Sequence, residues 1–390
     1  MLNVLESCGE RMTNYDIEME LESAQSALLK ENGSVVNLSY WNPGEDYKTQ
    51  VNKILQRIPI QDVFNYEYYF SESVKKEIFH KLGFSENFFK DSFLAAFPQS
   101  THAIATLAAF FSRRNMKVGI VAPAYFSIQA CLEDFKSLYS FFENFTPNFN
   151  EQFDVNILLH SDCEAFCFTS PINSTSVYLN SKVKDGIQKI LDAGKWVVLD
   201  ESLCVNGMEL ARTFGIQEKL LYVYSPHKAL GLQGIKFSTV VAKQDYYDEI
   251  DSLKHCYGGS LNVASQQGTS HFISKNFDEC CQIYNGFWHE NLVAVKQVLS
   301  AYDFAHFSEE MFGHYIMIFF DRSVNCKCFV EAMKQRMCKL GYSIYPGDMQ
   351  GFDSSKKFCF RVNLLLNRED LVKGLSAILN FFKEERDQKW

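Results

Sequence analysis

The chain has 390 residues, of which 47% are hydrophobic and 22% are charged, and its formal net charge is −9. This length allows a large buried core, shared between two domains or between one large and one smaller domain. The acidic balance argues against nucleic acid or an anionic membrane as a partner, and no apolar run approaches the roughly twenty residues of a transmembrane helix. The first residues contain no apolar core of the signal-peptide kind, so a cytoplasmic protein is expected.

The twelve cysteines are scattered, mostly through apolar segments. The closest pairs are Cys280 with Cys281 and Cys326 with Cys328, and neither has the spacing of a zinc site or a redox Cys-x-x-Cys motif. We therefore expect reduced thiols that pack as small hydrophobic side chains, and no metal centre.

Between residues 93 and 242, short apolar runs alternate with helical patterns. This alternation predicts a three-layer α/β sandwich with a mostly parallel seven-stranded sheet covered by helices on both faces. Only about eleven residues separate the last two expected strands, 220–225 and 237–242. This link is short for a parallel crossover, so strand 237–242 is expected to be antiparallel. The expected strands are 93–97, 117–122, 137–142, 165–170, 196–202, 220–225 and 237–242, with helices at 101–114, 127–135, 180–194 and 206–213.

After residue 245 the pattern becomes helical, and its strongest helical part is 276–302. Two apolar strands, 315–320 and 357–365, and a final helix, 368–385, come after it. This order predicts a smaller α+β domain. The expected organisation is an N-terminal segment that packs with the small domain (1–45), a large cofactor-binding domain (46–275) and a small C-terminal domain (276–390).

Polar residues follow several predicted strands directly. In LYVYSPHKALGLQG (221–234), Lys228 comes just after a buried-looking strand, where a cation is costly unless it is paired or used chemically. Each residue also has an ordinary structural explanation, such as a helix cap, a turn or a packed ring. The carboxyl ends of parallel strands meet at one edge of a sheet, so a ligand site is expected there. Its candidate residues are Gln99, Ser100, Thr101, Tyr125, Asn173, Asp200 and Lys228.

This set resembles the fold-type-I enzymes that depend on pyridoxal 5'-phosphate, and among them the class I/II aminotransferases. Residues 225–236, SPHKALGLQGIK, are similar to the family's S-x-x-K…G-x-R signature. The resemblance implies that Lys228 forms the Schiff base with the cofactor and that Ser225 and Lys236 contact its phosphate. Several positions depart from the family pattern: Lys236 replaces an arginine, Leu203 replaces a tyrosine, and NSTS (173–176) lacks the usual proline and glycine.

The other strand ends match the family in chain order. By resemblance, Asp200 in VVLDESL keeps the cofactor's ring nitrogen protonated, and Asn173 in SPINSTS bonds its phenolic oxygen. Tyr125 in PAY matches the aromatic residue that stacks on the ring. A helix N-terminus suits a phosphate dianion, and the matching turn here is QST: Gln99, Ser100 and Thr101.

The resemblance also reaches both ends of the chain. Arg361 in FCFRVN matches the arginine that grips the substrate α-carboxylate, and its planar fork suits a carboxylate. Trp41 in LSYWNPG stands where the family has a glycine near the substrate carboxylate, and Asn173 is also expected to contact the substrate. Three placements of this tryptophan stay open: closing the pocket, stacking on a substrate, or packing elsewhere. The family forms homodimers, and Tyr66, or alternatively Tyr68, matches the tyrosine donated to the neighbouring subunit's phosphate site.

The resemblance implies an aminotransferase that moves an amino group between an L-amino acid and a 2-oxo acid through a Lys228 aldimine. Lys228 would take the proton from the substrate's α carbon, with the cofactor as electron sink. One alternative is another pyridoxal-phosphate enzyme of the same fold, such as a lyase, cyclase, oxidase or decarboxylase. A non-catalytic ligand-binding relative is a further alternative, although such relatives lose the lysine freely.

Overall fold

A computed structural model describes most of the chain, and the candidate tyrosines Tyr66 and Tyr68 lie outside the described residues. In this described part, no helix combines the length and the apolar character needed to cross a membrane. The described residues are 14–30, 35–54, 69–81, 91–142, 149–204, 209–234, 236–257 and 260–384.

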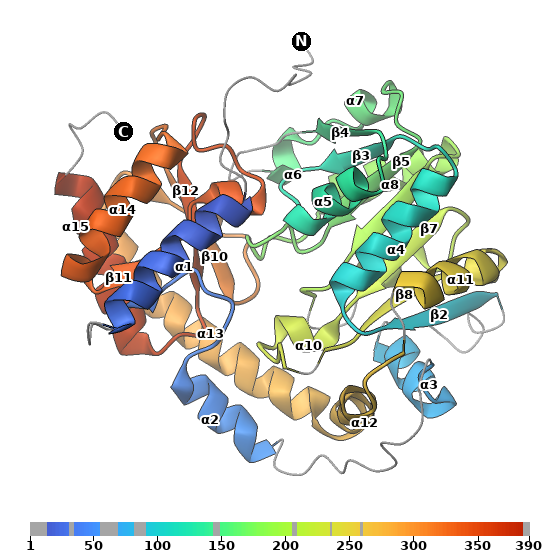
Figure 1. The fold of residues 1–390 in the computed structure, drawn as a ribbon, viewed down its shortest axis with the longest axis horizontal. Helices are drawn as coiled ribbons and strands as arrows, with labels where there is room; N and C mark the ends of the chain where they lie inside the picture. Colours follow the sequence, from blue (N-terminus) through green and yellow to red (C-terminus); the bar gives the residue numbers. More distant parts are fainter. Residues whose placement is uncertain are drawn as a thin grey trace.

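Seven strands form the central sheet in the order β2-β8-β7-β6-β5-β3-β4 (Figure 1). All are parallel except β8, which runs antiparallel to both β2 and β7. The prediction of one antiparallel strand is confirmed, because the link from β7 to β8 is too short for a crossover. The strands are β2 (Ser92–Phe97), β3 (Val118–Val121), β4 (Tyr139–Phe142), β5 (Ala165–Thr169), β6 (Trp196–Asp200), β7 (Leu220–Tyr224) and β8 (Ser238–Lys243).

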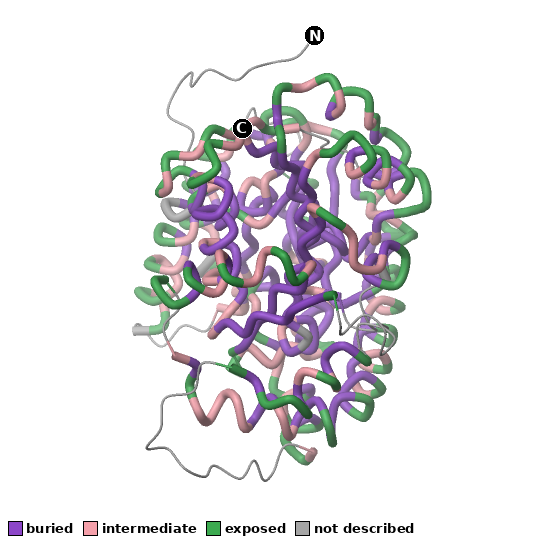
Figure 2. The backbone as a smooth tube through the Cα atoms, turned by 90° about the vertical axis from the view of Figure 1, so that its right-hand side faces the viewer, coloured by how far each residue is buried: buried purple, intermediate pink, exposed green. Residues whose placement is uncertain are grey.

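Alternate residues of the central strands enter two separate cores, one on each face of the sheet. In β6, Trp196 and Val198 belong to one cluster, and Val197 and Leu199 belong to the other. Buried backbone therefore runs through the middle of the molecule, with exposed residues on the outer helices (Figure 2). This is the predicted three-layer arrangement. One face is covered by α4 (Ser100–Arg113), α5 (Phe126–Asp134) and α11 (Tyr247–Tyr257), and the other by α6 (Phe149–Gln152), α7 (Val155–Leu159), α8 (Ser181–Asp192) and α9 (Glu209–Phe214).

A second, antiparallel sheet is built from the C-terminal part of the chain. Its order is β12-β10-β9, and Met317 of β10 lies opposite Arg361 of β12. A short parallel pair, β1 with β11, ties the N-terminal segment to this part. The elements are β9 (Ala305–His306), β10 (Tyr315–Phe320), β11 (Tyr342–Ser343), β12 (Cys359–Asn363), β1 (Val36–Asn37), α13 (Phe277–Leu299), α14 (Cys326–Leu340) and α15 (Arg368–Glu384).

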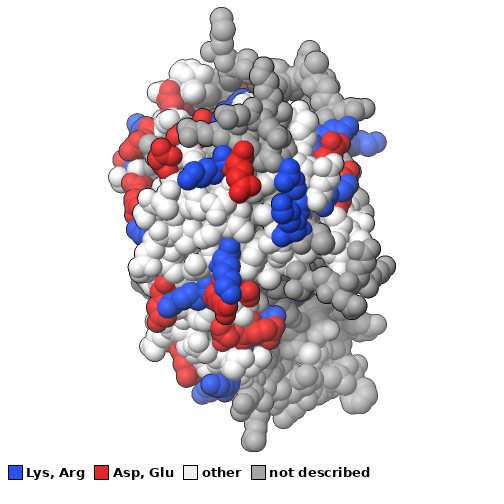
Figure 3. Space-filling model, turned by 90° about the vertical axis from the view of Figure 1, so that its left-hand side faces the viewer, with Lys and Arg blue, Asp and Glu red and all other residues white. Residues whose placement is uncertain are grey.

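Helix α1 (Asn14–Lys30) packs on α14 and is not predicted by the sequence pattern. Its fully buried side chains are Ile17 and Leu21, a stripe too narrow to stand out in a mostly polar segment. On the face shown in Figure 3, acidic and basic side chains are interspersed. One exposed pair, Lys334 with Glu20, joins α14 to α1 at 2.7 Å. Such pairs contribute at most about 1 kcal/mol, so buried contacts hold the helix.

The remaining helices lie along the chain before and between the strands of the two larger sheets. Among them, α2 packs against α13. The domain boundaries at residues 45 and 275 stay a prediction. These helices are α2 (Glu45–Ile54), α3 (Glu72–Lys81), α10 (Pro226–Ala229), α12 (Val263–His271), the π-helical η3 (Phe272–Asn276), and the 3-10 helices η2 (Gln244–Tyr246) and η4 (Gly347–Gln350).

Candidate active site

Lys228 lies in α10, the single helical turn that follows β7, and is half-buried. Its Nζ donates a hydrogen bond to Ser100 Oγ at 3.4 Å and lies 4.5 Å from the centre of the Tyr125 ring. These contacts join the strand ends of β7, β2 and β3, which are far apart in the sequence. The structure therefore brings together three of the residues that the sequence assigns to one site.

The start of α4 supplies the helix N-terminus of this site. Gln99 is the N-cap residue, and its side chain makes no capping hydrogen bond. Ser100 is buried and Thr101 is half-buried in the first turn. The backbone dipole of a helix favours an anion at this end, which is the arrangement predicted for the phosphate.

Asp200 and Asn173 occupy neighbouring strand ends. Asp200 ends β6, pairs in register with Thr169 of β5, is buried, and accepts a hydrogen bond from the Ser202 amide at 3.0 Å. Asn173 is buried in the loop after β5, and its Oδ1 accepts a hydrogen bond from Ser174 Oγ at 3.4 Å. Both lie at the carboxyl edge of the sheet, although their proposed contacts with a cofactor stay predictions.

The two other residues of the lysine motif differ in exposure. Ser225 is fully buried and donates its hydroxyl proton to Ser238 Oγ at 2.8 Å, so it stays free only as an acceptor in this arrangement. Lys236 is exposed. Between them, Gly231 has a φ of 70°, a conformation that favours glycine and allows the tight turn after α10.

Arg361 is fully buried on β12. Its Nε donates to Ser39 O at 3.0 Å, its Nη2 donates to the same oxygen, and its Nη1 donates to Ser174 Oγ at 3.0 Å. Burial lowers the pKa of the Arg361 guanidinium, and nearby Tyr315 and Tyr345 oppose that shift. The arginine therefore clamps the N-terminal segment to the loop that carries Asn173.

Trp41 packs on that guanidinium. The centre of the Trp41 ring lies 3.9 Å from Arg361 Cζ and 5.8 Å from Lys228 Nζ. The Tyr315 ring covers Arg361 as well, at 4.6 Å, and meets the Trp41 ring edge-on at 5.4 Å. Trp41 therefore does not pack away from the site. Its ring lies inside the site, over the Arg361 guanidinium.

Sequence reasoning missed Ser174, Ser176 and Tyr315. Ser176 has a φ of 56°, where glycine would be less strained, but its Oγ accepts a hydrogen bond from the Tyr315 amide at 3.1 Å. The signal was present in SPINSTS, because serines replace the proline and glycine of the family pattern. Their partners lie in distant segments, which no local pattern reveals.

Several buried polar atoms at this edge have no hydrogen-bond partner within the described part of the chain, although such atoms are normally paired. A bound polar group would supply partners. The amine of Lys228, the carboxylate of Asp200, the ring of Tyr125 and the start of α4 fit a phosphorylated pyridine ring with a carbonyl group. The unpaired atoms are His102 Nδ1, Thr169 Oγ1, Ser202 Oγ and His227 Nδ1.

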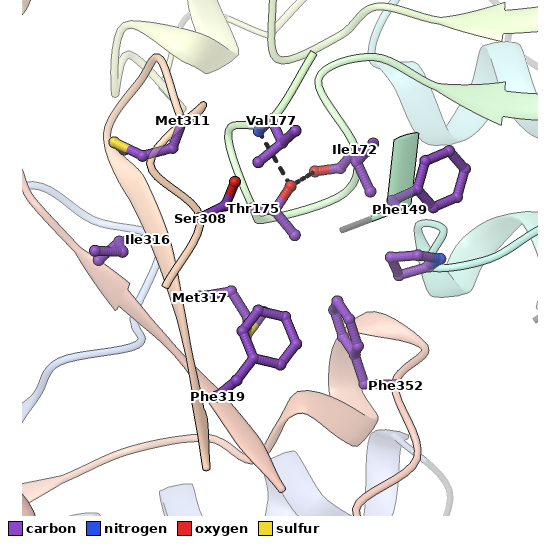
Figure 4. A pocket seen from close by; sticks show the side chains of 11 residues that line it. Phe149, Ile172, Thr175, Val177, Ser308, Met311, Ile316, Met317, Phe319 and Phe352 are labelled. Carbon is purple, nitrogen blue, oxygen red and sulfur yellow. Dashed lines mark hydrogen bonds between the residues drawn. The ribbon is translucent and has the colours of Figure 1, made fainter. Parts of the chain in front are cut away.

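A small apolar pocket, with room for about one water molecule, is shown in Figure 4. Met317, opposite Arg361 in the ladder and hence on the same face of the sheet, lines it with Phe319 and Phe352. On the facing wall, the hydroxyl of Thr175 is already bonded to Ile172 O at 2.9 Å. No charged residue is among the described residues that line this pocket.

Two buried histidines flank the site. Burial lowers the pKa of His227 from 6.5 to about 3, and Lys228 and Lys236 add to the shift. Burial also lowers the pKa of His314 to about 3, with a contribution from Arg361. The ring of His227 packs against Phe237, with 4.8 Å between centres. Both histidines are therefore neutral at physiological pH.

These shifts predict a loss of stability in acid. Below pH 6.5 the unfolded chain binds protons that the folded protein does not bind until about pH 3, so the free energy of unfolding falls as the pH falls through this window. In His227→Gln, the loss between pH 7 and 5 should shrink by roughly 2 kcal/mol, measured by urea unfolding. The control is His80→Gln, at an exposed position on α3. An equal loss in all three proteins would contradict this assignment.

No family model and no curated protein matches the sequence. Solved structures do match. An aspartate aminotransferase from Thermotoga maritima has a TM-score of 0.73 at 15% identity, over 96% of this chain and 98% of that one. A methionine aminotransferase from Escherichia coli has a TM-score of 0.71 at 13% identity, over 96% and 100% of the two chains. A kynurenine aminotransferase from Pyrococcus horikoshii has a TM-score of 0.73 at 14% identity, over 98% and 96%.

At such low identities, the structural similarity establishes a common fold only, and the chemistry has to be argued from the site residues. The coverage is nearly complete on both sides, so the N-terminal segment, the seven-stranded sheet and the C-terminal sheet all belong to the shared architecture. The chain has the fold of the class I/II aminotransferases that depend on pyridoxal phosphate.

Proposed function

We propose that the protein is a pyridoxal-phosphate-dependent aminotransferase that moves an amino group between an L-amino acid and a 2-oxo acid. The observation that carries the proposal is the placement of Lys228 and Arg361 against one ring, Trp41, at 5.8 and 3.9 Å. The Lys228 amine and the Arg361 guanidinium are thus close enough for the amino group and the carboxylate of one amino acid to reach both. Lys228 follows β7 and Arg361 lies on β12, and these strands belong to separate sheets, so this closeness is a product of the fold.

Each residue then has one task. Lys228 would hold the cofactor through its amine and move the proton at the substrate's α carbon. Asp200 would keep a proton on the ring nitrogen, Asn173 would bond the phenolic oxygen, and Tyr125 would cover the ring. Pyridoxal phosphate, when bound, supplies the electron sink that makes the α proton acidic. The phosphate would lie at the start of α4, with Lys236 as a further contact. Ser225 would join it by turning its hydroxyl proton from Ser238 Oγ to the phosphate.

The apolar pocket of Figure 4 supports an apolar substrate side chain. Its walls carry no charge among the described residues, and a charged side chain placed there would lose its hydration without gaining a partner. Amino acids with apolar side chains are therefore the proposed substrates.

The test is to add single amino acids to the protein loaded with pyridoxal phosphate, without any 2-oxo acid. Transamination should yield one 2-oxo acid per bound cofactor and then stop. Continued turnover without a 2-oxo acid would show that the protein catalyses another pyridoxal-phosphate reaction, such as elimination, cyclisation, oxidation or decarboxylation. A protein that takes up no pyridoxal phosphate would overturn the cofactor assignment.

A cytoplasmic homodimer completes the proposal. It rests on the resemblance, in which Tyr66 or Tyr68 reaches the neighbouring subunit's phosphate site. Sedimentation of the purified protein tests the dimer, and a monomer that is fully active would contradict it.

A further inference from the structure

Arg361 keeps part of its hydrogen-bonding capacity unused. A guanidinium has five N–H groups, and three of them serve Ser39 O and Ser174 Oγ. The two that remain are one on each terminal nitrogen, the number that a carboxylate needs for a bidentate pair. The oxygens already bonded are neutral, so these bonds give the buried charge no counter-ion.

The Trp41 indole stands between this guanidinium and the substrate space. With Trp41 and Tyr315 against it, Arg361 has no exposed surface, so an incoming carboxylate has no free path to the two remaining N–H groups. An aromatic face also offsets part of the cost of a buried cation. The Glu18 carboxylate also stabilises this charge electrostatically, and the indole adds to that stabilisation while no substrate carboxylate is bound.

The main chain that carries Trp41 is fastened on both sides. Asn363 Nδ2 donates to Tyr40 O at 3.0 Å and to Asn42 O at 3.2 Å, and Gln233 Nε2 donates to Trp41 O at 3.2 Å. Four consecutive carbonyls, from Ser39 to Asn42, are thus held in place. On the side that Trp41 covers, only rotation of the indole side chain can uncover Arg361 without breaking these bonds.

We propose that Trp41 is a specificity-determining residue that caps Arg361, so that a carboxylate binds only by displacing the indole. The cap sets how strongly the site prefers a carboxylate to a neutral group of the same shape. The proposal rests on the proposed role of Arg361 in carboxylate binding. A desolvated cation–π contact is worth enough to weaken carboxylate binding by about 10- to 30-fold.

The probes are 3-phenylpropanoate, which has no amino group to react, and its neutral amide. The full-length protein, saturated with pyridoxal phosphate, is labelled with 5-fluorotryptophan, and the Trp41 signal is assigned with Trp41→Phe. The carboxylate should shift that signal to saturation, and the amide should not. Trp41→Ala should bind the carboxylate about 10- to 30-fold more tightly, Trp41→Phe should be intermediate, and amide affinity should not change.

Trp196→Phe is the matched control, because Trp196 begins β6 at the end of the sheet opposite the site. It should leave both affinities unchanged. Binding of the carboxylate without movement of the Trp41 signal would overturn the proposal. So would a Trp41→Ala protein that binds the carboxylate no more tightly than the parent, or not at all. Because these readouts involve no turnover, failure of transamination alone would count against the proposed function and not against the cap.

Discussion

Replacing Lys228 with alanine should abolish both the visible absorbance of the cofactor-loaded protein and its turnover. General-base catalysis alone contributes about 10²–10⁴-fold, and loss of covalent attachment adds to this, so we expect kcat to fall by at least roughly 10⁴-fold. Folding should be little affected, because the lysine makes one long hydrogen bond, at 3.4 Å, to Ser100. Absorbance spectra, turnover and thermal unfolding of the same samples measure the three effects.

Lys243→Ala provides the comparison for that experiment. Lys243 ends β8 and pairs at the surface with Asp245 at 3.1 Å, so its loss should leave absorbance and turnover unchanged. A Lys228→Ala protein that keeps its colour would show that another amine holds the cofactor. Retention of turnover would remove Lys228 from the reaction altogether.

The second large effect is expected from Arg361→Met. Methionine has a similar length but makes none of the three hydrogen bonds, and it leaves Ser39 O without its charged donor. The lost bonds outweigh the relief of no longer burying a cation, so the free energy of unfolding should fall by roughly 2–4 kcal/mol. Urea unfolding measures this change, and affinity for 3-phenylpropanoate should fall in parallel.

Arg368→Met is the matched control for stability. Arg368 lies at the start of α15, is largely exposed, and pairs with Glu290 at 2.8 Å, so its replacement should cost at most about 1 kcal/mol. If the two variants lost equal stability, Arg361 would not be the clamp described. Loss of stability with unchanged carboxylate affinity would leave the clamp intact and move the substrate site elsewhere.

Strands of the central sheet were predictable because each is a short apolar run that enters two cores, as β6 and β7 do. The direction of β8 was predictable from the length of a single link. By contrast, α1 and α14 were missed, because a helix that buries a narrow stripe against another helix resembles a polar segment. A local sequence pattern therefore reveals a strand that is buried on both faces more readily than a helix that buries only a narrow stripe.

By itself, the sequence determined which polar residues follow the strands, and with that the candidate set around Lys228, Asp200 and Asn173. Their convergence on one edge follows from parallel strand order. Only the tertiary structure decided that Trp41 covers Arg361 and that Ser174 bonds it. The physical reason is distance along the chain: Ser39 and Arg361 are 322 positions apart, and only the packing of the N-terminal segment against β12 brings a carbonyl, a guanidinium and an indole into contact.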